Sequence, residues 1–181
     1  MGKEVTSRLI LVKVKEEYVN YLRKYDNKVQ INSRALQKEN KPFVGILFKV
    51  KGLKYFVPIS SNGKEKLNKM FDNYIKTGKK PIDLFFIEEM ENNKRKMISV
   101  LNLNNMIPVC DSAIIYYDLN KDKNYHLLRK KIEFCNKNKE IIISNSKRIY
   151  NAVTTHSWSS LENRCCNFKI LEEKCMEYQN L

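Results

Sequence analysis

Tyr55-Phe56-Val57-Pro58-Ile59-Ser60-Ser61 is an apolar stretch that ends in two adjacent hydroxyls, and an asparagine and a glycine follow it directly. Its apolar residues predict a buried strand that ends at the serines. The last serine or the asparagine after it can cap a helix over residues 64–76, which begins with Lys64 and Lys66. Paired hydroxyls beside ammonium groups can bind a phosphate and stabilise charge that develops on it. The stretch therefore predicts a phosphate-handling junction between a strand and a helix.

The charge of the chain points to an anionic partner. The 181 residues include 34 Lys+Arg against 20 Asp+Glu, a net charge of +14, and 43% of them are hydrophobic. This hydrophobic content predicts one folded domain over residues 1–181 rather than disorder. The excess of cations is too large to be only a solvated face, and it predicts attraction to phosphate backbones or to an anionic membrane.

The sequence favours a protein of the cytoplasm. No apolar run approaches the ~18–20 residues that a membrane-spanning helix needs. Residues 1–15 mix charges among their apolar residues and lack the apolar centre of a signal peptide. No basic amphipathic helix with an aromatic apolar face stands out, so a basic protein bound to a membrane surface is only a third, weaker interpretation.

The cysteines, histidines and carboxylates do not predict a metal site. Cysteines occur at positions 110, 135, 165, 166 and 175 without a CxxC pair, and His126 and His156 lie far apart. We therefore expect the cysteines to be small buried hydrophobes in a reducing compartment. The acids lack the clustered pattern that a metal-dependent nuclease needs, and we expect neither a metal nor a cofactor.

The first two thirds of the chain alternate between strands and short helices. Periodicity and turn residues predict strands at 9–14, 43–50, 54–59, 82–89 and 96–101, with helices at 16–26 and 64–76. Residues 51–53 and Asn92-Asn93 are expected to close two hairpins. Residues 27–41 read as a polar, basic loop, and residues 102–108 as an asparagine-rich turn.

The last third changes to a helical period. Helices are predicted at 124–138, 140–154 and 161–178, of which the last has the clearest repeat of apolar residues. The run Ile141-Ile142-Ile143 alone could instead be a strand. Strands first and helices last define an α+β protein with a helical C-terminal third.

Blocks of sequence in a fixed order cover nearly the whole chain. They are Tyr-Leu-Arg-Lys-Tyr-Asp at 21–26, Lys-Pro-Phe-Val-Gly-Ile-Leu at 41–47, Lys-Tyr-Phe-Val-Pro-Ile-Ser-Ser at 54–61, Asn-Leu-Asn-Asn-Met-Ile-Pro-Val at 102–109, Lys-Arg-Ile-Tyr-Asn at 147–151 and Cys-Cys-Asn-Phe-Lys-Ile-Leu-Glu at 165–172. Any one block is weak, but together and in this order they are specific. They resemble the type III toxin–antitoxin toxins, the ToxN/AbiQ endoribonuclease family.

The resemblance implies a fold, an activity and a partner. The fold would be a compact SH3-like β-barrel of the plasmid-toxin type with added helices. The activity would be metal-independent cleavage of A-rich cellular or phage RNA, in phage defence by abortive infection. The inhibitor would be an antitoxin RNA of repeated pseudoknot units, which closes with the protein into a ring-like assembly.

This chain departs from the family pattern in two places. The family usually has a proline and then a lysine directly after the paired hydroxyls, whereas here Asn62 and Gly63 precede Lys64. Either Lys64 or Lys66 could be the active lysine, and we favour Lys64. The family also tends to carry a tyrosine a few residues before position 41, and here Gln37 or Lys38 could fill its role.

RNA supplies its own nucleophile, because the 2′-hydroxyl can attack the neighbouring phosphorus and expel the 5′-oxygen. Ser60 and Ser61 can donate hydrogen bonds to the phosphate, and Lys64 adds positive charge at a helix N-terminus. A neighbouring Lys41 or Lys38 would lower the pKa of that lysine and fit it for proton transfer. Ser60, Ser61, Lys64 and Lys41 are thus the candidate catalytic residues, and 2′,3′-cyclic phosphate and 5′-hydroxyl ends are the expected products.

The remaining cations are candidates for RNA binding, against plainer alternatives. The expected contacts are Arg34, Lys38, Lys66, Lys69, Lys79, Lys80, Lys147 and Arg148. Taken alone, Ser60-Ser61 is more often a strand end with a helix cap, and lysines on a helix are usually solvated. The asparagines of residues 102–105 would mainly shape a turn, with a supporting role for one of them possible. A non-catalytic nucleic-acid-binding module is the rival function.

Overall fold

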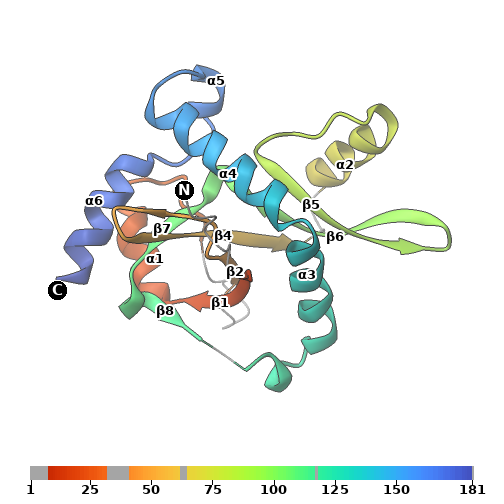
Figure 1. Cartoon of the computed structure of the whole chain (residues 1–181), viewed down its shortest axis with the longest axis horizontal. Helices are drawn as coiled ribbons and strands as arrows, with labels where there is room; N and C mark the ends of the chain where they lie inside the picture. The colour runs from red at the N-terminus through yellow and green to blue at the C-terminus, as the bar shows by residue number, and fades with distance from the viewer. Residues whose placement is uncertain (1–7, 32–40, 62–64, 117, 181) are drawn as a thin grey trace, which may run out of the picture.

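The computed structural model describes residues 8–31, 41–61, 65–116 and 118–180, without the side chain of Ser61. The fold is an antiparallel sheet with helices packed around it (Figure 1). Its strands are β1 (Ile10–Val14), β2 (Pro42–Gly45), β3 (Lys49–Val50), β4 (Leu53–Ser61), β5 (Leu84–Glu91), β6 (Lys94–Asn102), β7 (Ile107–Val109) and β8 (Ile114–Ile115). Strands dominate the first two thirds of the chain and the last third is helical, which confirms the α+β class.

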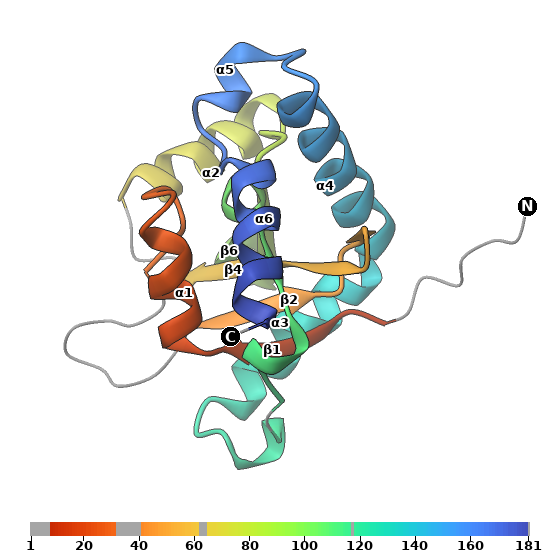
Figure 2. The same cartoon turned by 90° about the vertical axis from the view of Figure 1, so that its left-hand side faces the viewer.

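The helices complete the architecture. They are α1 (Glu16–Arg23), α2 (Glu65–Thr77), α3 (Tyr125–Lys137), α4 (Lys139–Thr154), α5 (Ser159–Glu162) and α6 (Phe168–Gln179), with 3-10 turns η1 (Leu103–Asn105), η2 (Asp111–Ala113) and η3 (Leu119–Lys121). α6 contacts α1, α4 and β7. Figure 2 shows α6 in front of the sheet, with α1 and α4 on either side. α2 lies apart from α1 and α6, beside the β5–β6 hairpin (Figure 1).

β4 is the centre of the sheet. Tyr55, Phe56 and Val57 are fully buried, as expected for a continuous apolar run with protein on both faces. The N-terminal half of β4 pairs with β3 and β7, and its C-terminal half pairs with β2 and β6. Each of these four strands therefore fixes part of β4, which ends at the paired serines.

The sheet is not a closed barrel. Its strand order is β5-β6-β4-β2-β1-β8, with β3 and β7 joined to β4 at the side. The two ends of this order, β5 and β8, do not pair with each other within the described residues. The SH3-like barrel that the family resemblance implies is therefore not confirmed, whereas the antiparallel sheet with added helices is.

Both predicted hairpins are confirmed. β3 and β4 are joined by Lys51 and Gly52, and β5 and β6 by Asn92 and Asn93, and all four residues have positive φ. This left-handed backbone suits glycine and asparagine in a tight turn. The β5–β6 strands run further than expected, to Glu91 and from Lys94, because the charged residues beside the turn also pair in register.

Two element predictions are wrong. The strand expected over residues 43–50 is split into β2 and β3, and residues 46–48 between them are not a strand. The helix expected over residues 161–178 is broken into α5 and α6, because the Asn167 side chain caps a new helix by accepting from the Ile170 amide. The Asp26 carboxylate also accepts from the Asn167 amide, at 2.6 Å, and fixes the break.

The isoleucine run 141–143 is helical, since it belongs to α4. All five cysteines are buried and free, which confirms their prediction as core residues. Burial raises the pKa of the Cys135 thiol to about 12 and keeps it protonated. Within the described ranges, no helix is long and apolar enough to cross a membrane.

A buried carboxylate joins α6 to the sheet and to α4. Glu172 is 5% exposed, and its Oε1 accepts from the hydroxyls of Tyr55 at 2.9 Å and Tyr150 at 2.7 Å. Lys169 Nζ lies 3.4 Å from Oε2. Burial and the nearby Glu172 charge raise the pKa of both tyrosines, so their hydroxyls remain donors. This cluster connects β4, α4 and α6.

Candidate active site

The paired serines lie at the end of β4, where it pairs with β6, and shortly before α2 in the sequence. Ser60 pairs with Val100 and Ser61 with Ser99, and the Ser99 hydroxyl donates to the Ser60 carbonyl at 2.7 Å. α2 is anchored beside this point by a small core of its own. The members of that core are Leu67, Phe71 and Tyr74 from α2 and Phe86, Met97 and Val100 from the β5–β6 hairpin. The β5–β6 hairpin therefore holds both elements: β6 pairs with the end of β4, and the hairpin packs against α2.

The Ser60 hydroxyl is turned into the protein. The residue is only 6% exposed, and its Oγ accepts from Asn102 Nδ2 at 2.6 Å. The same hydroxyl donates to Gln30 Oε1 at 3.5 Å. Neither Gln30 nor Asn102 is among the candidate catalytic residues of the sequence analysis. Asn102 ends β6 and belongs to the asparagine-rich segment for which a supporting role is one of the predicted alternatives, but no sequence signal marks Gln30.

Lys41 directly precedes a strand that pairs with β4. It is half-buried and stands before β2, in which Phe43 pairs with Pro58 and Val44 with Val57. The β2–β4 pairing ends at Phe43 and Pro58, which are two residues from Lys41 and from Ser60 respectively. A role for Lys41 at the paired serines therefore stays a prediction.

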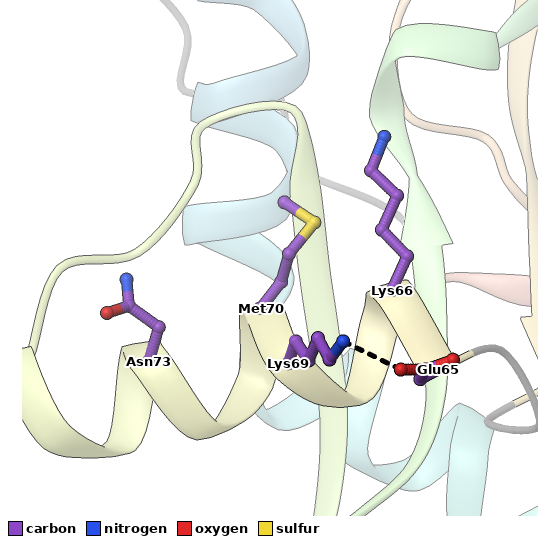
Figure 3. A pocket seen from close by; sticks show the side chains of 5 residues that line it. All are labelled: Glu65, Lys66, Lys69, Met70 and Asn73. Atoms are coloured by element: carbon purple, nitrogen blue, oxygen red, sulfur yellow. Dashed lines mark ion pairs between the residues drawn. The ribbon is translucent and has the colours of Figure 1, made fainter.

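The first turns of α2 present cations beside the same junction. Lys66 and Lys69 line an open hollow of about 440 Å³ together with Glu65, Met70 and Asn73. Figure 3 shows Lys69 paired with Glu65, at 2.6 Å, while Lys66 points away from that pair. The Glu65–Lys69 pair is exposed on both sides, so it contributes little stability and leaves Lys69 accessible to an anion.

A second group of cations follows α2 and continues onto α4. Lys79 and Lys80 are exposed, and Lys80 lines a small cavity that Asn145 of α4 also lines. Lys147 and Arg148 are exposed on α4 just beyond that asparagine. The Lys80 ammonium also lies 5.3 Å from the centre of the Tyr74 ring. A basic surface can therefore extend from α2 to α4.

Several candidates lie outside the described residues. Arg34, Gln37, Lys38, Lys64 and the Ser61 side chain belong to this group, and their roles stay predictions. The two histidines are on the surface, and His156 pairs with Glu162 at 2.7 Å. Trp158 is 43% exposed in the turn before α5. Within the part of the chain that the structure describes, no group of three His, Cys, Asp or Glu side chains can hold a metal ion.

The fold and this junction together define a small basic α+β protein with hydroxyls, amides and lysines gathered at the end of a central strand. Residues 10–176 match the family model for toxin ToxN of the type III toxin–antitoxin system. The chain therefore belongs to the ToxN toxin family, which is a family of RNA-cleaving toxins.

Curated relatives and solved structures agree with this assignment. The chain is 32% identical to endoribonuclease ToxN of Bacillus thuringiensis subsp. kurstaki, over 92% of this chain and 82% of that protein. It is 30% identical to endoribonuclease AbiQ of Lactococcus lactis subsp. lactis, over 91% of this chain and 86% of that protein.

Two solved structures share the fold. The structure of AbiQ, a lactococcal anti-phage endoribonuclease, superposes with a TM-score of 0.80 at 25% identity, covering 97% of this chain and all of that one. A toxin whose structure shows selective inhibition by a non-coding RNA pseudoknot superposes with a TM-score of 0.76 at 28% identity, over the same share of each chain. The fold likeness therefore extends over almost the whole molecule.

Proposed function

We propose that this protein is the endoribonuclease toxin of a type III toxin–antitoxin system, acting in the cytoplasm as one domain over residues 1–181. The observation that carries the proposal is the family match over residues 10–176, which includes the serine end of β4 and the lysines of α2. The substrates are A-rich cellular or phage RNAs. The inhibitor is an antitoxin RNA of repeated pseudoknot units.

The proposed chemistry is a transesterification within the RNA. The 2′-oxygen loses its proton and bonds to the adjacent phosphorus, and the bond from phosphorus to the 5′-oxygen breaks as that oxygen gains a proton. The products are a 2′,3′-cyclic phosphate and a 5′-hydroxyl. The Ser61 hydroxyl and Lys64 stabilise the negative charge on the phosphate oxygens. Lys41 is the neighbouring cation that tunes Lys64 for proton transfer.

The antitoxin is proposed to use the same basic surface as the substrate. Lys66 and Lys69 on α2, the pair Lys79-Lys80, and the pair Lys147-Arg148 are exposed and available to phosphates. Arg34 and Lys38 are proposed to add to them. An RNA that covers this surface blocks the site, and contact at both ends of each RNA unit would close a ring.

Cleavage of a long, unstructured, A-rich RNA by protein stripped of nucleic acid tests this function. A non-catalytic RNA-binding module, the rival function, would bind the same RNA with a steep dependence on salt and leave it intact. Addition of a pseudoknot-repeat RNA should stop the cleavage. Cleavage that continues with the repeat RNA bound would contradict the proposed competition for one surface.

Replacing Ser61 by alanine is expected to slow cleavage by about a hundredfold, because removal of one donor to a developing oxyanion costs ~10²–10³ in rate. RNA affinity and thermal stability should stay near those of the unaltered protein. Single-turnover rates and a binding titration measure both effects. Ser112→Ala serves as the control, because Ser112 lies on an exposed 3-10 turn. A Ser61→Ala protein that cuts at the normal rate would remove Ser61 from the proposed chemistry.

Replacing both Lys79 and Lys80 by alanine is expected to weaken RNA binding. For each lysine that pairs with a phosphate, its removal should reduce the slope of log affinity against log salt by about 0.7–0.9. Binding titrations at several salt concentrations measure this slope. Lys121→Ala, an exposed lysine of η3 outside the proposed surface, should leave it unchanged. A change in the control half as large as that in the double variant, one charge against two, would mean that the affinity reflects net charge alone.

A further inference from the structure

A chain of side-chain amides leads from a loop to the Ser60 hydroxyl. Asn105 Nδ2 donates to the Lys28 carbonyl at 2.8 Å, and Gln30 Nε2 donates to Asn105 Oδ1 at 3.2 Å. Gln30 Oε1 accepts from Ser60 Oγ at 3.5 Å, and Ser60 Oγ accepts from Asn102 Nδ2 at 2.6 Å. The members come from the loop after α1, from β4, from the last residue of β6 and from η1.

The Lys28 carbonyl, at one end of this series of hydrogen bonds, determines which group donates in each of them. The Lys28 carbonyl can only accept, so the amide nitrogen of Asn105 must face it and the amide oxygen of Asn105 must face Gln30. The nitrogen of Gln30 then faces Asn105, and its oxygen faces Ser60. Ser60 must therefore donate its proton to Gln30, since an amide oxygen offers none.

Because of these bond directions, the Ser60 hydroxyl has no proton left to donate to an RNA phosphate. A serine hydroxyl has one proton, and here that proton is directed at Gln30 inside the protein. Donation to a phosphate would require the hydroxyl of this residue, which is only 6% exposed, to rotate and leave the Gln30 oxygen without its donor. Among the paired serines, Ser61 is then the one that can serve as the phosphate donor.

The loop around Lys28, where this series of hydrogen bonds begins, is itself held by several hydrogen bonds. The Asp26 carboxylate accepts from the Lys28 amide at 2.9 Å and from the Asn167 amide at 2.6 Å. Lys28 Nζ donates to the Cys165 carbonyl at 2.9 Å. The loop that carries Gln30 is thus fastened to the turn between α5 and α6.

We propose that Gln30 is a positioning residue for RNA cleavage, which acts through the Ser60 hydroxyl. It connects the end of β4 to the anchored loop after α1 and so fixes the orientation of the Ser60 hydroxyl and of the strand end that carries it. The inference rests on the proposed function and deepens it, because alignment of the attacking oxygen with the phosphate depends on such fixed distances. It also assigns Ser60 to the support of the site rather than to contact with the substrate.

A double-mutant cycle in cleavage kinetics tests the inference. The variants are Gln30→Met, which keeps the length of the side chain but cannot hydrogen-bond as an amide, Ser60→Ala, and the two combined. Each single variant should lower kcat about tenfold, the effect of one hydrogen bond, with KM within about twofold. Because both act through one chain of bonds, the combined variant should be no slower than the slower single variant.

The controls separate a positioning role from general damage. Gln179→Met, at the exposed end of α6, should keep the kcat of the unaltered protein. The melting temperature of each variant is measured beside its rate. If Gln30→Met melts several degrees lower, Gln30→Ala, which only shortens a half-buried side chain, replaces it in the cycle.

The outcomes distinguish this inference from the function on which it rests. An unaltered protein that leaves RNA intact would refute the proposed function, and the inference with it. An active protein in which Gln30→Met has normal kcat, or in which the two losses multiply to about a hundredfold, would refute only the positioning role. A loss confined to KM would place Gln30 in RNA binding instead.

Discussion

Replacing Lys64 by alanine is expected to reduce the single-turnover rate of RNA cleavage by about 10²- to 10³-fold, the effect of losing one group that stabilises charge in the transition state. The lysine follows the paired serines in sequence and directly precedes α2, and its charge is proposed to act together with the Ser61 hydroxyl. RNA affinity should fall much less, because Lys66, Lys69 and the other exposed cations still contact phosphates. Rapid-quench cleavage and a binding titration on the same RNA give the two quantities.

Two further variants make this prediction specific. Lys66→Ala removes an exposed charge two residues on, in the first turn of α2, and should slow cleavage far less than Lys64→Ala. If Lys66→Ala causes the greater loss, the insertion of Asn62 and Gly63 has moved the active lysine to position 66. Lys64→Arg keeps the charge but cannot easily release a proton, so it restores activity only if charge is the sole role of the lysine.

Replacing Glu172 by alanine is expected to lower the free energy of unfolding by about 3–5 kcal/mol, since one partner of a buried hydrogen-bonded cluster is removed. The hydroxyls of Tyr55 and Tyr150 would remain buried without their acceptor, and α6 would lose its attachment to β4. For a chain of this size, such a loss lowers the melting temperature by roughly 10 °C. Urea unfolding followed by circular dichroism measures the free energy.

Two further variants, Glu173→Ala and Glu172→Gln, show whether the loss of stability comes from the buried cluster. Glu173→Ala, at the next position of α6, removes an exposed carboxylate and should change the stability by less than about 0.5 kcal/mol. Glu172→Gln keeps an acceptor for the tyrosines and should recover part of the loss. A Glu172→Ala protein as stable as Glu173→Ala would show that the cluster does not hold α6 to the sheet.

Local signals were sufficient to predict much of the fold. The apolar run of β4 and the asparagines of the β5–β6 turn each satisfy a local rule, respectively burial on both faces and positive φ. The break between α5 and α6 was missed because the apolar repeat continues across it. The N-cap at Asn167 and its contact with Asp26 set the boundary, and only the cap leaves a signal in the sequence.

The candidate site was predictable only in part. The serines were recognised from their place after an apolar strand, but their unequal environments were not, because Ser60 meets Gln30 and Asn102 from distant parts of the chain. The pairing of β2, which follows Lys41, with β4 is likewise a long-range contact that local periodicity does not specify. The barrel came from the resemblance alone, and the strand order leaves the sheet open.

Cleavage of an A-rich RNA in excess EDTA, followed by analysis of the product ends, tests the proposed chemistry most directly. Attack by the 2′-hydroxyl predicts undiminished cleavage, with 2′,3′-cyclic phosphate on one product and a 5′-hydroxyl on the other. Attack by water activated on a metal ion would instead stop in EDTA and leave 5′-phosphate or linear 3′-phosphate ends. Products of that second kind would contradict a mechanism carried by the serines and lysines alone.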